Sequence, residues 1–250
     1  MCIRDSLKTL VEFYDQRNEG NWYCTSPINA MLGEELALAL LSDYIRTQKG
    51  GSFEITQPKC TQGFKRGKWL DAWLRFSPKT SETPSLFQTE IKNWNANSVN
   101  GAKLSIDADE EKLKDFRIKR WAKRFEQISK DEKQPAYVPK EFGTRKVLLK
   151  MKLPKGVDEN ERSKVRPLLI FWEAMHPKGK ADPLFWVPTG GDANINQIGA
   201  SKLWVFSISQ HVRNYLARAY GRRKTTLFID SNIMPLSNRR LEWIDKILVR

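Results

Sequence analysis

The chain has 250 residues, of which 40% are hydrophobic and nine are Trp, so it can bury a sizeable core and does not have the composition of a disordered protein. Its 43 Lys and Arg against 29 Asp and Glu give a net charge of +14. This charge favours a polyanionic partner, nucleic acid first and an anionic membrane surface second, with a merely basic soluble protein as the alternative.

Three scattered cysteines, with no Cys-x-x-Cys motif, argue against a structural zinc site and against a disulfide framework. No apolar run approaches the roughly 20 residues of a membrane span, and the N-terminus has no apolar signal-peptide segment. We therefore expect a cytoplasmic protein with no membrane partner. Residues 1–6 resemble adapter-derived sequence, so the true N-terminus is left open.

The first long element expected is a helix over residues 29–48. Leu38, Leu41 and Ile45 recur at spacings of three and four, which is typical of a buried helical stripe. A Lys-Gly-Gly sequence follows and should end the helix. Glu34 lies four residues before Leu38, at the head of this stripe, where a carboxylate is costly unless it is paired or bound.

Three strands are expected next, at residues 52–57, 68–76 and 86–93. The connection at 77–85 is too rich in Pro, Ser and Thr to continue either neighbouring strand. Asp71 lies on the second strand. Glu90 and Lys92 lie on the third, where a side-chain period of two puts them on one face with Gln88. A hairpin of these strands would bring two carboxylates and an ammonium together.

The rest of the chain alternates strands and helices. A helix should run from about 107 to 130, and its Lys/Arg-rich face is either solvated or turned toward phosphates. A Gly/Asn-rich loop at 190–199 is a candidate lid or binding loop. His176 and His211 belong to no recognisable constellation and are interpreted as structural or surface residues. The other expected elements are strands at 144–153, 168–174, 203–208 and 225–230, and helices at 210–220 and 237–249.

The carboxylates are suited to phosphodiester hydrolysis, which needs a cation at the phosphate oxygens and a positioned water. Asp71 and Glu90 would be Mg²⁺ ligands, and the carbonyl of Ile91 could add a third oxygen. Lys92 would orient or help to deprotonate the attacking water. Glu34 could bind a second metal or an outer water. The structural alternative is an Asp at a strand edge beside a Glu/Lys pair across strands.

These residues resemble the PD-(D/E)xK nuclease superfamily, which has the restriction-endonuclease-like fold. The family's Asp matches Asp71 in Trp-Leu-Asp-Ala-Trp, and its Glu-x-Lys matches Glu-Ile-Lys at 90–92. Its helical Gly-Glu-x-x-Ala matches Gly-Glu-Glu-Leu-Ala at 33–37. The resemblance covers about residues 30–153. It departs from the family motif at Leu70, which stands where the motif has Pro.

The resemblance implies an α/β fold: one domain over 1–250, with an αβββαβ core, a mixed central sheet flanked by helices, and an α/β elaboration from about 155. It implies an endonuclease that hydrolyses DNA with Mg²⁺, or with Mn²⁺ in its place. A catalytically silent DNA-binding protein and an RNA-directed nuclease are the alternatives.

Many enzymes of this fold cut as dimers, so a homodimer is left open. The candidate nucleic-acid contacts are polar side chains beside the third strand and basic residues of the later helix. For Trp94, core packing is the alternative. The set comprises Gln88, Asn93, Trp94, Arg213, Arg218, Arg222, Arg223 and Lys224.

Overall fold

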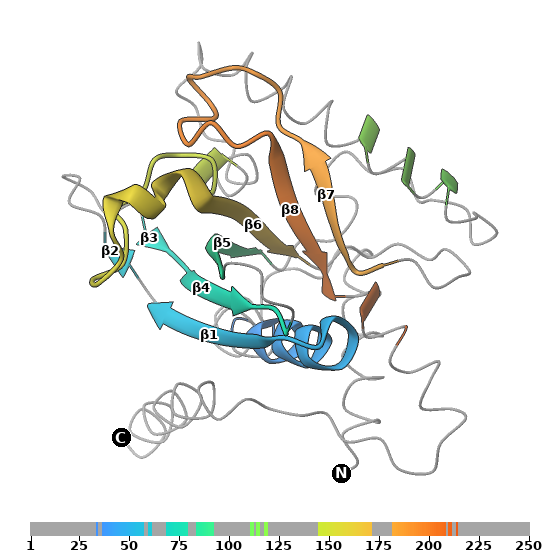
Figure 1. Ribbon diagram of the computed structural model, residues 1–250. Coiled ribbons are helices and arrows are strands. Elements are labelled where there is room, and N and C mark those ends of the chain that lie inside the picture. Colours follow the sequence, from blue (N-terminus) through green and yellow to red (C-terminus); the bar gives the residue numbers. More distant parts are fainter. Residues whose placement is uncertain are drawn as a thin grey trace, which may run out of the picture.

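The protein is built on one mixed sheet (Figure 1). The computed structural model describes residues 37–57, 60–61, 69–79, 84–92, 145–171 and 182–208, together with Glu34 and the positions 111–112, 114–115, 118–119, 210–211 and 214. Six strands lie in the order β1-β4-β5-β6-β8-β7, and a short two-stranded ladder, β2-β3, stands beside them. The chain is therefore a mixed α/β protein.

The first half of the sheet is an antiparallel meander and the second half is mainly parallel. β1 (Ser52–Gln57), β4 (Ala72–Ser77) and β5 (Ser85–Lys92) pair antiparallel in sequence order. β6 (Val165–Phe171) then runs parallel to β5, and β8 (Lys202–Ser207) runs parallel to β6. β7 (Leu184–Pro188) closes the edge, antiparallel to β8. Parallel neighbours need long crossovers and cover on both faces.

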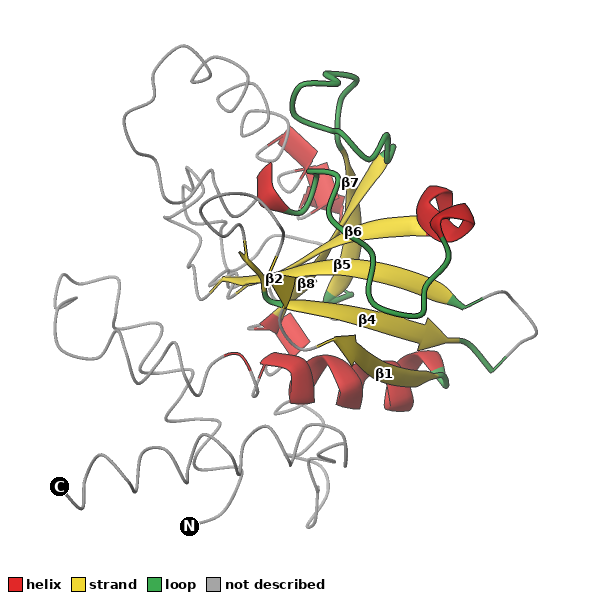
Figure 2. Cartoon of the chain, turned by 90° about the vertical axis from the view of Figure 1, so that its left-hand side faces the viewer, coloured by secondary structure: helices red, strands yellow, loops and turns green. Residues whose placement is uncertain are grey.

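A helix over residues 37–44, continued by the wider turn η2 (Ile45–Lys49), covers one face of the sheet (Figure 2). The predicted stripe of Leu38, Leu41 and Ile45 is buried, and the helix packs against strand residues such as Leu74 and Ile91. Gly50 ends the helix with a left-handed φ of 65°, and its N–H donates to the Ile45 carbonyl. The predicted helix and its stop signal are confirmed for the residues that the structure describes.

Residues 145–157 cover the opposite face, and the strand predicted at 144–153 is wrong. Residues 145–146 form a helical turn, 147–149 are turns, and 150–154 have no regular structure. Val147, Leu148, Leu149 and Met151 are all buried, whereas Lys150 and Lys152 are exposed, so from residue 149 onward the segment turns one side to the sheet without forming a strand. The alternating pattern therefore came from an irregular segment that lines the sheet.

The fourth strand of the sheet in chain order is β6, which the sequence placed at 168–174 and which begins three residues earlier, at Val165. Its Leu168, Leu169 and Ile170 are buried, as expected for a central strand with both faces covered. β6, β7 and β8 extend the sheet begun by β1, β4 and β5. The three strands described after residue 155 are thus part of the main sheet.

Of the remaining predicted elements, some are confirmed, one is divided, and some lie outside the described residues. Strands 52–57, 86–93 and 203–208 are confirmed as β1, β5 and β8. The strand at 68–76 is split at Asp71 into β3 (Trp69–Leu70) and β4; β3 pairs with β2 (Cys60–Thr61). The loop at 190–199 is confirmed.

The helices at 107–130 and 210–220 are helical at every position described, and the elements at 225–230 and 237–249 lie outside the described residues. None of the helices described is long and apolar enough to cross a membrane.

Candidate active site

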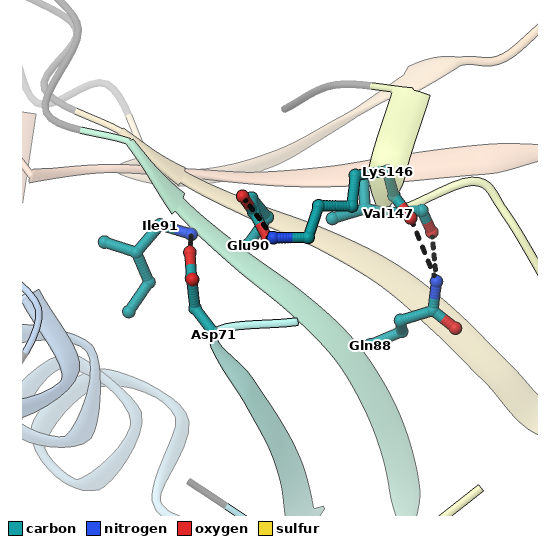
Figure 3. Close-up of polar contacts among 6 residues, drawn as sticks. All are labelled: Asp71, Gln88, Glu90, Ile91, Lys146 and Val147. Carbon is teal, nitrogen blue, oxygen red and sulfur yellow. Dashed lines mark hydrogen bonds and ion pairs between the residues drawn. The ribbon is translucent and has the colours of Figure 1, made fainter. Parts of the chain in front are cut away.

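Asp71 stands at the break between β3 and β4, at the level of Glu90 on the neighbouring strand. The five β4–β5 pairs run without a register shift to Ala72 and Thr89, so the next residues across the pair are Asp71 and Glu90. Asp71 Oδ2 accepts a hydrogen bond of 2.7 Å from the Ile91 N–H (Figure 3). The long connection before β5 therefore does not slip Asp71 past the Glu-x-Lys segment.

Glu90 is fully buried and forms an ion pair with Lys146 that the sequence did not reveal. The Lys146 ammonium lies 2.7 Å from Glu90 Oε2 and 3.0 Å from Oε1. The side chains of Lys146 and Glu90 are only 7% and 1% exposed. Two charges removed from water to this extent are tolerated only because each faces the other. Figure 3 shows Asp71 turned toward the Ile91 peptide and Glu90 turned toward Lys146.

Gln88 holds the turn that carries Lys146. Its side-chain nitrogen donates to the carbonyls of Leu149 at 2.8 Å and Val147 at 3.0 Å, and lies 3.4 Å from the Lys146 carbonyl. All three partners are acceptors, so the amide nitrogen must face them. The side chain is wholly enclosed, and from this position it cannot touch DNA. Gln88 therefore changes from a predicted DNA contact to a residue that positions Lys146.

The other predicted site residues are placed only in part. Lys92 ends β5 and pairs with Phe171 of β6, but its side chain lies outside the described part of the structure. Glu34 occupies a half-buried helical position. Among the residues described, no three His, Cys, Asp or Glu side chains gather closely enough to hold a metal ion. The predicted contacts that lie outside the described residues are Asn93, Trp94, Arg213, Arg218, Arg222, Arg223 and Lys224.

The chemistry open to this site depends on the Glu90–Lys146 pair. A hard cation such as Mg²⁺ binds carboxylate oxygens, and Asp71, at the break before β4, lies level with Glu90 on β5. The donor types fit such a cation. Lys146 already occupies the oxygens of Glu90 as a fixed positive charge. A metal that used Glu90 would therefore compete with the Lys146 ammonium or share the carboxylate with it.

A second buried polar pair joins the helix to the segment after β8. His211 Nε2 lies 3.2 Å from Asp43 Oδ2, and both side chains are almost completely enclosed. The His211 ring meets the Tyr44 ring edge-on, with 5.7 Å between centroids. This enclosure agrees with the structural interpretation of His211. It also shows Asp43 as a buried acid that the sequence pattern did not single out.

Comparison with known proteins adds no relative: no family model, no curated protein and no solved structure matches the chain. The resemblance to the nuclease superfamily therefore rests on the residues that carry it and on the order of the elements. Asp71, Glu90 and Lys92 are its main support.

Proposed function

We propose that the protein is a metal-dependent endonuclease that hydrolyses DNA phosphodiester bonds at Asp71 and Glu90. The observation that carries this proposal is the register that sets Asp71 across from Glu90, with the Asp71 carboxylate bonded to the peptide that follows Glu90. The antiparallel β1-β4-β5 meander with β6 parallel to β5 supports it, because the αβββαβ core needs that order. The charge of +14 suits a polyanionic substrate.

In this proposal Asp71, Glu90 and the carbonyl of Ile91 hold Mg²⁺, with Mn²⁺ as a substitute. The cation supplies charge neutralisation at the scissile phosphate and lowers the pKa of a bound water. Lys92 orients the attacking water, and Glu34 contributes an outer ligand or a second-metal ligand. Lys146 places its positive charge against the buried Glu90 carboxylate and so offsets part of the cost of burying that group.

The direct test is cleavage of supercoiled plasmid DNA with Mg²⁺. We expect wild type to nick or linearise the plasmid, EDTA to abolish the reaction, and Asp71→Asn or Lys92→Ala to lower the rate at least about a hundredfold, the scale of one lost charge-stabilising group. The matched control is Glu54→Gln, an exposed carboxylate on β1. Equal cleavage by wild type and Asp71→Asn would exclude the assignment. Parallel reactions on single- and double-stranded DNA and RNA test the RNA-directed alternative.

A second candidate function is DNA binding without cleavage. The observation that favours it is the burial of Glu90 and its neutralisation by Lys146, which leaves this carboxylate enclosed rather than open to a phosphate. A silent protein would bind DNA equally well with EDTA and with Mg²⁺, and would cut no nucleic acid. Binding that strengthens with Mg²⁺ and depends on Asp71 would instead support the nuclease.

A further inference from the structure

A separate pocket lies at the opposite end of the sheet from Asp71. It has a volume of about 300 Å³ and is formed between the end of the helix and the strand ends near Phe76, Ser85 and Arg166. Along β5, Ile91 beside Asp71 lies four positions after Phe87 in this pocket, which is roughly 13 Å at the usual rise of a strand. The pocket is therefore distinct from the candidate active site.

The walls of the pocket are apolar and include two aromatic rings that contact each other. The helix contributes Leu41 and Ile45, and the sheet contributes Leu74 and Leu168. The rings of Phe87 and Trp204 meet edge-on, with 6.4 Å between centroids and an interplanar angle of 87°. Such walls favour a flat or branched apolar group, and the volume is at the lower end for small-molecule sites.

The charged groups at the pocket are both cations. Arg166 is exposed, and among the residues described it makes no ion pair and no side-chain hydrogen bond. Lys49 also lines the pocket, but its ammonium is shared with Asp182 at 3.1 Å. None of the described residues that line the pocket is Asp or Glu. The pocket therefore combines an apolar interior with one solvent-exposed guanidinium that no described side chain neutralises.

We propose that this pocket binds a small amphipathic anion, namely an aromatic or branched apolar body that carries one carboxylate. The apolar body occupies the space beside Phe87 and Trp204, and the carboxylate pairs with Arg166, whose planar fork matches two carboxylate oxygens. The inference uses no residue of the candidate active site. It stands or falls independently of the nuclease proposal.

The test is isothermal titration with 1-naphthoate and with its neutral analogue 1-naphthamide, without DNA or metal. We expect wild type to bind naphthoate more tightly than the amide. Arg166→Gln should weaken naphthoate binding about three- to thirtyfold, the scale of one charge-assisted hydrogen bond, and leave the amide unchanged. The matched control is Lys202→Gln, since the Lys202 ammonium lies over the Trp186 ring and outside the pocket lining.

A second variant tests the apolar part of the site. Leu184→Trp at the sheet edge places a larger side chain in the pocket and should reduce binding of both compounds, while circular dichroism confirms an unchanged fold. Three results would overturn the proposal: no binding of naphthoate to wild type, equal affinity for acid and amide, or unchanged binding in Arg166→Gln. Loss of plasmid cleavage in an Asp71 variant that still binds naphthoate would separate the two sites.

Discussion

Lys146 and Glu90 are 56 positions apart in the chain and form an almost completely enclosed ion pair. At the scale of single residues, such a pair is a poor source of net stability because both ions lose their hydration. It is nevertheless costly to break from one side, because the remaining charge stays buried. A cation that binds Glu90 must compete with the Lys146 ammonium or share the carboxylate with it.

Replacing Lys146 alone should therefore be strongly destabilising. We expect Lys146→Met to lower the free energy of unfolding by about 3–5 kcal/mol, because Glu90 is left buried and uncompensated. The double variant Lys146→Met with Glu90→Leu should regain most of this loss. Urea unfolding of the four proteins of the cycle gives the coupling energy. Lys152→Met, an exposed lysine of the same segment, should change little, and a Lys146→Met protein as stable as this control would contradict the expectation.

At the scale of elements, the irregular segment 145–157 is held to the sheet by polar contacts as well as by apolar packing. Gln88 binds three of its carbonyls. Arg162 of η4 (Glu159–Lys164) donates to the Met151 carbonyl at 2.9 Å. Arg162 also bonds Glu159 and so lowers the pKa of that carboxyl. A segment that pairs with no strand of the sheet is thereby fixed in position.

Two substitutions can separate the contribution of the Gln88 hydrogen bonds to stability from the contribution of its side-chain volume. Gln88→Glu keeps the shape but turns a carboxylate toward three carbonyl oxygens, whereas Gln88→Leu removes the polar group. We expect Gln88→Leu to cost about 1–3 kcal/mol through unpaired carbonyls, and Gln88→Glu to cost more. Thermal and urea unfolding measure both, with the exposed Gln48→Leu as control. If Gln88→Glu is the milder change, the hydrogen bonds do not hold the segment.

At the scale of the whole molecule, the proposed DNA substrate would meet a chain with a net charge of +14. Lys114 and Lys119 are exposed helical positions on the basic segment between β5 and β6. Their face is either solvated or turned toward phosphates. The two cases differ in how strongly DNA binding depends on salt, because each neutralised phosphate releases counterions.

We expect the affinity for a labelled DNA duplex to fall steeply as salt rises. If the helix faces phosphates, Lys114→Gln and Lys119→Gln should each reduce the slope of log affinity against log salt by about one. Fluorescence anisotropy in EDTA measures this without cleavage. Lys152→Gln on the segment after residue 149 is the matched control. Slopes equal to that of the control would assign the helix face to solvent.

Part of this architecture could be predicted from local sequence. The helix at 37–49, β1, β5 and β8 follow from apolar periodicity and from the glycine that stops the helix. Asp71 and Glu90 could be placed on neighbouring strands, but the long connection at 77–85 left their register open, and only the β4–β5 pairing decided it. The strand predicted at 144–153 was wrong because alternation cannot distinguish a strand from an irregular segment buried on one side.

By itself, the sequence determined the local elements, the basic charge and the positions of the candidate carboxylates, since these depend on neighbours along the chain. Only the tertiary structure decided what those carboxylates meet. Lys146 reaches Glu90, and Arg166 stands over an apolar pocket, because strands and segments far apart in sequence pack together. Long-range packing sets burial, and burial decides whether a charge is solvated, paired or left open to a ligand.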